Sequence, residues 1–390
     1  MILCADKVIT GDGKTVIDRG GVLVRGKKIE VVKEADSLKQ EYPGEEVKVY
    51  DGCTLLPGLI DLHVHIGYYY GEEASGEYEK NLMLRAYYAG KRMEDTLRSG
   101  VTTVRDLSSA DGIANTLKRA AQMGLVRSPR IFTSLKGLCM TGGHGAEMTG
   151  AVIEVDGTLE AKKAVRENLK NGADCLKLLT SEGYRGEEFS QEELDAIVTE
   201  AHRFGKTVAA HAGYGKSIPM CIRAGCDTIE HGTHLTVSQA EEMKKNHQTW
   251  VPTMYAFHYV NDLIGEGLCG DELFQENQEY IRNAVDAYKK HFKELYDTGV
   301  RVAAGTDTDA LNHPEASPVA RECEYMVRYG LSPVQAVGCA TGNAGEVLSA
   351  EIGRMKEGYM ADLLVVKGDV SKDISALLSP QAVYQEGTRI

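Results

Sequence analysis

The stretch LLPGLIDLHVH, residues 55–65, is apolar except for Asp61 up to two histidines, His63 and His65. A short run without polar alternation is typical of a parallel strand that is buried on both faces. Side chains at positions i and i+2 of a strand point to the same side, so the two imidazoles can bind one metal ion. Taken alone, the pair is a weak signal, because such pairs also occur in ordinary polar packing.

Seven more apolar runs follow, separated by charged segments with a helical period. In the segment 191–206 apolar residues recur on one helical face, and Gly205 stands where a helix commonly ends. Strands that alternate with helices predict an α/β fold, in which residues 55–349 form a (β/α)8 TIM-like barrel. The seven further strands are expected at VTTVRDL (101–107), RIFTSLKG (130–137), DCLKLLT (174–180), TVAAHA (207–212), DTIEHG (227–232), TWVPTM (249–254) and VRVAAGTD (300–307).

The two ends of the chain have a different pattern. Residues 1–54 contain short β-branched runs punctuated by glycine and lysine, and strand-like sequence returns in MADLLVVKG (360–368). We therefore expect residues 1–54 and 350–390 to meet in one small β-sandwich domain beside the barrel.

The composition indicates a soluble, cytoplasmic protein. Its 390 residues are 43% hydrophobic, but no apolar run approaches the length of a membrane span, and the N-terminal residues lack a secretory pattern. A formal charge of −13 disfavours nucleic acid and membranes as partners. The nine cysteines are scattered without a CxxC pair, so we expect them to be reduced. The expected partner is a small-molecule or peptide substrate, and a homo-oligomer is possible.

In a barrel of this type the active site lies at the carboxyl ends of the strands. Imidazoles and carboxylates that converge there from different strands are typical ligands of zinc, iron or manganese. Besides His63 and His65, the polar residues expected in or at the ends of these strands are Lys177, His211, His231 and Asp307. The sequence therefore predicts a metal site at this end of the barrel.

Charged residues inside apolar strands need partners, because burying an isolated charge is costly. Lys177, within CLKLL, has two interpretations. A buried lysine with a lowered pKa can react with carbon dioxide, and the resulting carbamate can bridge two metal ions. Alternatively, Lys177 pairs with an acid such as Asp174 or Glu182. Arg105 and Asp106, at the end of another strand, are expected to form a supporting ion pair.

Several sequence motifs occur in this order over essentially the whole chain: LLPGLIDLHVH, GVTTVRD, KLL, AAHA, TIEHG, AAGTD and GRMKEGYMADLLVV. Together they resemble the amidohydrolase superfamily, and within it the branch of imidazolonepropionase-like proteins, prolidase-like dipeptidases and related metal carboxypeptidases. The resemblance implies two divalent metal ions, with zinc as the first expectation and manganese, iron or cobalt as alternatives. It assigns the first ion to His63, His65 and Asp307, and the second to His211 and His231, with N6-carboxylated Lys177 as the bridge.

The resemblance also implies the reaction. Imidazolonepropionase is mononuclear and lacks the bridging lysine, so Lys177 favours the dipeptidase-like side of the branch. We expect a metal-activated hydroxide to cleave the amide C–N bond of a dipeptide or an N-acyl amino acid, with Asp307 as general base and acid. One alternative is a cyclic amidohydrolase or deaminase acting on a heterocycle. A non-catalytic scaffold is another, but all six ligand positions are filled here.

The loop CMTGGHGAEMTG (139–150) contains a candidate catalytic and substrate-binding residue, His144. Glycines let a backbone approach a ligand closely, and loops carry many binding residues. Similar prolidase-like proteins have GGHG here, which places the histidine near the substrate, with its carbonyl oxygen as one possible contact. The alternative is an ordinary surface loop with one exposed histidine.

Three further substrate contacts are predicted. In HAGYGKS (211–217), Tyr214 can donate a hydrogen bond and Lys216 can pair with a carboxylate. Prolidase-like relatives often have a tyrosine directly after the His-Ala pair, whereas Gly213 intervenes here. Tyr255, after the strand at 249–254, is either a pocket residue or a packing residue.

Overall fold

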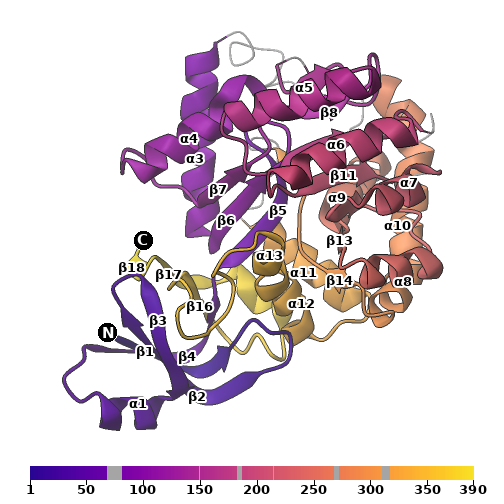
Figure 1. Cartoon of the computed structure of the whole chain (residues 1–390). Coiled ribbons are helices and arrows are strands. Elements are labelled where there is room, and N and C mark those ends of the chain that lie inside the picture. Colours follow the sequence, from indigo (N-terminus) through magenta and orange to yellow (C-terminus); the bar gives the residue numbers. More distant parts are fainter. Residues whose placement is uncertain (68–80, 149, 182–186, 214, 268–271, 310–316) are drawn as a thin grey trace.

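The computed structural model describes residues 1–67, 81–148, 150–181, 187–213, 215–267, 272–309 and 317–390. Their named strands form three sheets, one of mixed direction and two parallel. Figure 1 shows the mixed sheet at the lower left, near both chain ends, and the parallel strands among the helices above it.

Both ends of the chain contribute strands to the mixed sheet, whose order is β18-β17-β16-β4-β1-β2-β3. Neighbouring strands are antiparallel except β1 and β4, which run parallel. We expected a two-sheet sandwich, but the described residues show one sheet of seven strands. Its strands are β1 (Ile2–Ile9), β2 (Val16–Arg25), β3 (Lys28–Glu34), β4 (Val47–Pro57), β16 (Leu363–Lys367), β17 (Pro380–Gln385) and β18 (Thr388–Arg389).

Gly58 is the point at which the chain passes from the mixed sheet into a parallel one. We expected a single strand over 55–65, but β4 pairs with β16 as far as Pro57, and the next strand begins at Leu59. A Cβ atom on residue 58 would lie 2.2 Å from the hydroxyl oxygen of Thr102, so only glycine allows the backbone this close approach.

The two parallel sheets have the orders β15-β5-β6-β7 and β14-β13-β12-β11-β10-β8-β9. Each of the eight predicted segments contains one of their strands, and three short strands, β8, β9 and β15, were not expected. The strands are β5 (Leu59–His65), β6 (Val101–Asp106), β7 (Arg130–Thr133), β8 (Gly137–Cys139), β9 (Val152–Glu154), β10 (Leu176–Leu179), β11 (Val208–Ala212), β12 (Thr228–His231), β13 (Thr249–Val251), β14 (Arg301–Val302) and β15 (Thr308–Asp309).

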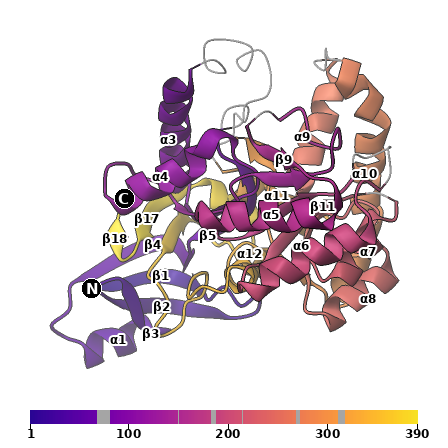
Figure 2. The same cartoon turned by 45° about the horizontal axis from the view of Figure 1, so that its top comes forward.

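Helices lie outside the parallel strands (Figure 2), and α5, α6, α7 and α8 pack one against the next. The prediction for 191–206 is confirmed: Ser190 and Glu193 form a capping box, and Gly205 follows the last turn with φ +64°. The helices are α1 (Ala35–Glu41), α3 (Leu82–Arg98), α4 (Ile113–Gln122), α5 (Gly157–Lys170), α6 (Gln191–Arg203), α7 (Ser217–Ala224), α8 (Val237–Lys245), α9 (Met254–Gly265), α10 (Glu272–Asp297), α11 (Pro318–Arg328), α12 (Pro333–Cys339) and α13 (Gly342–Val347).

Two expectations from the composition can be compared with this fold. The eight cysteines in the described ranges are all free and buried, as expected for reduced thiols. Within the same ranges, no helix has the length and apolar character that crossing a membrane requires.

Every residue of β5, β10 and β12 is buried, as expected for strands covered on both faces. These strands nevertheless contain ionisable side chains. Because such groups are stable in an interior only with partners, their contacts define the candidate site. The ionisable residues of the three strands are Asp61, His63, His65, Lys177, Glu230 and His231.

Candidate metal centre

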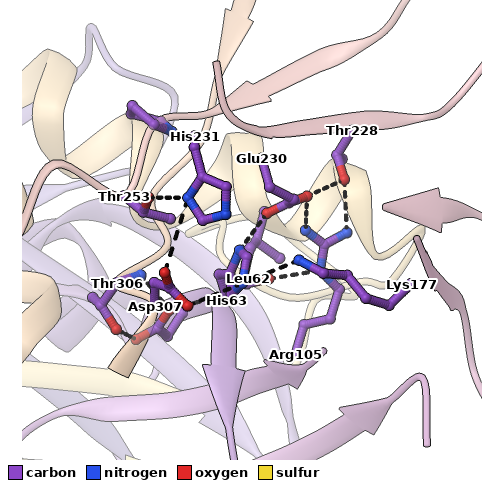
Figure 3. Close-up of polar contacts among 12 residues, drawn as sticks. Leu62, His63, Arg105, Lys177, Thr228, Glu230, His231, Thr253, Thr306 and Asp307 are labelled. Carbon is purple, nitrogen blue, oxygen red and sulfur yellow. Dashed lines mark hydrogen bonds and ion pairs between the residues drawn. The ribbon is translucent and has the colours of Figure 1, made fainter. Parts of the chain in front are cut away.

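Strand β5 brings His63 and His65 to its carboxyl end, where both face Asp307. Nε2 of His63 lies 3.3 Å from Oδ1 of Asp307, and Nε2 of His65 lies 3.1 Å from the same atom. Figure 3 shows His63 and Asp307 at this point. The three residues each offer a ligand atom within 4.8 Å of the others, the only such group of three found among the described histidine, cysteine and acidic residues.

Asp307 reaches this position through an irregular backbone. We expected a strand over 300–307, but ladder pairing ends at Val302. Asp307 has φ +55°, a left-handed conformation that non-glycine residues adopt rarely, and its N–H donates to the carbonyl of His63 at 2.7 Å. Asp61 holds the preceding residue, because it accepts hydrogen bonds from the N–H and the hydroxyl of Thr306 at 3.0 and 2.6 Å.

The other ring nitrogen of each β5 histidine, Nδ1, already has a hydrogen-bond partner. Nδ1 of His63 lies 2.8 Å from Glu230, and Nδ1 of His65 lies 3.2 Å from the carbonyl oxygen of Ser108. A carboxylate and a carbonyl only accept, so in each neutral ring the proton is on Nδ1 and the lone pair of Nε2 faces Asp307. Two lone pairs and a carboxylate oxygen converge, an arrangement that fits a cation.

Electrostatics favour the metal-binding protonation states of His63 and Asp307, whereas the contact with Asp307 outweighs burial and raises the pKa of His65. Burial, assisted by the neighbouring Lys177, lowers the pKa of His63 well below its ordinary value. Burial opposes the charge of Asp307, but His63 and His65 outweigh it and hold the pKa of Asp307 well below its ordinary value. Neutral imidazoles and an ionised carboxylate are the ligand forms that zinc requires.

Lys177 lies beside this cluster, 1% exposed, with Nζ 3.3 Å from Nε2 of His63. Burial lowers its pKa to about 8, although Glu230 opposes the shift. The expected alternative, an ion pair with Asp174, is wrong, because Asp174 lies 2.6 Å from the ammonium group of Lys118 instead. Glu182, the other acid considered, lies outside the described residues.

Three more histidines lie next to the cluster. The ring centroid of His231 is 5.1 Å from that of His63 and 4.5 Å from that of His211, and the rings of His211 and His144 are 4.2 Å apart. Burial lowers the pKa of both His231 and His144 to about 4, so both rings are neutral near pH 7. His231 also forms a hydrogen bond with Thr253, whose hydroxyl oxygen lies 2.7 Å from Nδ1 of the ring.

His144 is positioned by a loop with several anchors. This loop connects β8 to β9, and the N–H groups of Gly142 and His144 donate to Glu154 and Glu188, both at 2.8 Å. The structure therefore brings His144 next to His211, and its contact with the substrate stays a prediction.

The other predicted substrate contacts lie in different settings. Lys216 is exposed and lies 3.4 Å from Glu187, whereas Tyr255 is buried in the first turn of α9. Tyr214 lies outside the described residues. Substrate binding by all three stays a prediction. Gly213, the departure from the prolidase-like pattern, lies close to Tyr280: a Cβ atom on residue 213 would be 2.2 Å from the hydroxyl oxygen of that tyrosine, which would have to move.

Sequence reasoning missed Glu230 and gave Arg105 the wrong partner. Arg105 pairs with Glu230 at 2.8 Å, whereas Asp106 accepts hydrogen bonds from the N–H of Ile66 and the hydroxyl of Thr133. A glutamate in the apolar run DTIEHG is as unusual as the lysine in CLKLL, and the same reasoning could have identified it.

Comparisons with known proteins identify the family to which the chain belongs. The model of the amidohydrolase family matches residues 54–388. Ochratoxinase from Aspergillus niger is 29% identical in an alignment 421 positions long, gaps included, that covers 98% of this chain and 84% of that protein. An Xaa-Pro dipeptidase solved with methionine in its active site has 28% identity and a TM-score of 0.86, covering 100% of this chain and 99% of the other. A prolidase complexed with N-methylphosphonate-L-proline has 26% identity, a TM-score of 0.86 and the same coverage.

These neighbours imply an α/β, TIM-like barrel architecture, which the parallel strands fit. Members of the family generally use divalent metal ions, and the His63, His65 and Asp307 cluster has the composition that such ions require. Since the family match takes in most of the chain, this protein belongs to the amidohydrolase family and is a hydrolytic enzyme acting on carbon–nitrogen bonds.

Proposed function

We propose that the protein is a binuclear metal-dependent hydrolase that cleaves the amide bond of a dipeptide or an N-acyl amino acid. The observation that carries the proposal is the convergence of His63, His65 and Asp307 beside the buried Lys177. The similarity to an Xaa-Pro dipeptidase and a prolidase supports the substrate class.

The side chains divide into two ligand sets in this proposal. His63, His65 and Asp307 would hold one ion and His211 and His231 the second, and an N6-carboxylated Lys177 would supply an anionic ligand to both. A lysine whose pKa is lowered to about 8 has a larger neutral fraction, the form that reacts with carbon dioxide. Nitrogen and oxygen donors fit zinc, with manganese, iron and cobalt as alternatives. Bound ions of this kind supply Lewis acidity, which polarises a carbonyl and lowers the pKa of water.

The proton transfers are assigned to Asp307. Its lowered pKa keeps the group as a carboxylate near neutral pH. Oδ1 faces the two β5 histidines, whereas Oδ2 is 4.0 Å from Nδ1 of His231. We place the proton taken from water on Oδ2, from which it passes to the leaving nitrogen. His144, neutral near pH 7, donates its ring N–H to the substrate carbonyl oxygen.

The proposal includes the architecture that holds these groups. Two backbone hydrogen bonds join a strand of one parallel sheet to a residue flanking a strand of the other. The N–H of Leu62 in β5 donates to the carbonyl of Ala304, after β14, at 3.0 Å, and the N–H of Asp174, before β10, donates to that of Thr133 in β7 at 2.8 Å. They support an eight-stranded barrel over residues 55–349, with residues 1–54 and 350–390 as a separate small β-domain.

A substrate screen tests the function. Protein loaded with Zn²⁺ or Co²⁺ is assayed against Xaa-Pro dipeptides, other dipeptides, N-acetyl amino acids, cyclic ureides and aminopurines. We expect release of free amino acid from the first three classes, and release about 10²- to 10⁴-fold slower from Asp307→Asn protein prepared in the same way. Turnover confined to cyclic ureides or to exocyclic amines would contradict the proposal and favour the heterocycle-directed alternative.

A further inference from the structure

We propose that Glu230 and Arg105 are positioning residues that set the metal affinity of the site formed by His63, His65 and Asp307. This inference rests on the proposed metal-dependent function, but it concerns side chains that are not expected to contact either ion. Its basis is a chain of buried polar contacts that runs from β6 through β12 to His63 (Figure 3).

Glu230 uses its two carboxylate oxygens for different partners. Oε2 lies 2.8 Å from Nδ1 of His63, whereas Oε1 lies 2.8 Å from Nη2 of Arg105 and also accepts the hydroxyl of Thr228. The side chain has no exposed surface, so no solvent competes for either oxygen. Oε2 therefore contacts the metal-site histidine, His63, while Oε1 pairs with Arg105.

Arg105 is itself fixed at several points. Its Nε donates to the carbonyl oxygen of Leu62 at 2.7 Å, and Nη1 donates to the hydroxyl of Thr228 at 3.2 Å. Leu62 precedes His63 in β5, so the guanidinium contacts both the backbone beside the histidine and the carboxylate that orients its ring. The side chain is 1% exposed and permanently charged, which makes Glu230 its required counterion.

The contact between Glu230 and His63 has a chemical consequence at the far side of the ring. A carboxylate that accepts the Nδ1 proton fixes the tautomer and the ring plane and makes Nε2 a stronger donor to a metal. The other β5 histidine, His65, donates Nδ1–H to a neutral carbonyl oxygen. Only His63 of the pair therefore has a charged partner at Nδ1. A purely structural ion pair would not need an oxygen directed at His63.

Two variants separate this role from a structural one. Glu230→Gln keeps the shape of the side chain and removes its charge, but leaves Arg105 buried without a counterion. Arg105→Met/Glu230→Gln removes both charges and keeps an amide oxygen available for His63. The matched control is Arg130→Met, which breaks another partly buried ion pair, that of Arg130 with Asp362 at 2.6 Å, outside the site.

The readout is the apparent dissociation constant of Zn²⁺, measured by competition with a chromophoric chelator, together with the melting temperature of the metal-free protein. We expect both Glu230 variants to bind the metal about 10- to 100-fold more weakly. The absorption spectrum of the Co²⁺ form should also change. Arg130→Met should lower the melting temperature and leave both the zinc affinity and the cobalt spectrum unchanged.

If Glu230→Gln fails to fold, the zinc affinity of the double variant, which has no unpaired buried charge, tests the positioning role. Zinc affinity within about two-fold of the wild type in the double variant would overturn the inference and leave the pair a structural one. A wild-type protein that binds no zinc or cobalt would instead contradict the proposed function itself. The two failures are therefore distinguishable.

Discussion

Oδ1 of Asp307 lies 3.1 Å from Nε2 of His65, and residues 308 and 309 pair with β5 directly after this contact. Asp307→Asn keeps the size of the side chain but removes its charge and its ability to hold a proton. Since a positioned general base contributes about 10²- to 10⁴-fold, we expect kcat/KM to fall by that factor. The assay is amide cleavage at saturating Zn²⁺, and Asp18→Asn, on the exposed part of β2, should retain activity. Asp307→Asn protein with undiminished turnover would remove Asp307 from the mechanism.

Lys177→Ala should lose both metal ions together, because the proposed bridge joins the two ligand sets. Metal content per chain, measured by plasma mass spectrometry after dialysis, should fall from two equivalents in the wild type to little or none. Lys118→Ala is the matched control, since this lysine pairs with Asp174 away from the cluster. A single firmly held equivalent in the wild type would contradict the binuclear part of the proposal.

His144→Asn should reduce kcat without loss of metal. His144 lies outside the group of three convergent ligand atoms and is proposed to act on the substrate carbonyl. Loss of one such hydrogen-bond donor costs about 10²- to 10³-fold in kcat. His202→Asn, which alters a histidine paired with Asp227 on the outside of α6, serves as the control. If His144→Asn protein loses metal in parallel with activity, then His144 is a ligand and not a substrate contact.

Glu322 should make the protein less stable as the pH rises. This carboxyl group in α11 accepts the N–H groups of Met254 and Tyr255, but burial outweighs these hydrogen bonds and raises its pKa to about 8. Between its ordinary value, 4.5, and about 8, the folded protein keeps a proton that the unfolded chain has lost. The unfolded state then binds fewer protons, so the free energy of unfolding falls with rising pH in this window.

Urea unfolding at about pH 5 and about pH 8 tests this prediction for Glu322. Glu322→Gln cannot titrate and should show a smaller decline in the free energy of unfolding than the wild type. The exposed Glu241→Gln provides the control and should behave as the wild type does. An identical decline in all three proteins would show that Glu322 is ionised throughout this range.

Local patterns were enough to predict much of the fold. The helix at 191–206 and the strands that contain Lys177 and His211 were found where expected, because apolar period and capping residues act over a few positions. Strand boundaries that depend on which strands pair with each other were not predictable from local patterns. Only the pairing of β4 with β16 shows that the first predicted strand divides at Gly58.

The sequence by itself determined the residue types that the site needs and the strands from which they come. His63 and His65 share one side of β5 because the side chains of a strand alternate with a period of two. Only the tertiary structure decided their partners. Glu230 lies 167 residues from His63 and 125 from Arg105, yet it contacts both. The physical reason is that a buried charge takes whichever partner the packing of distant strands brings within hydrogen-bond distance, and no local pattern encodes that packing.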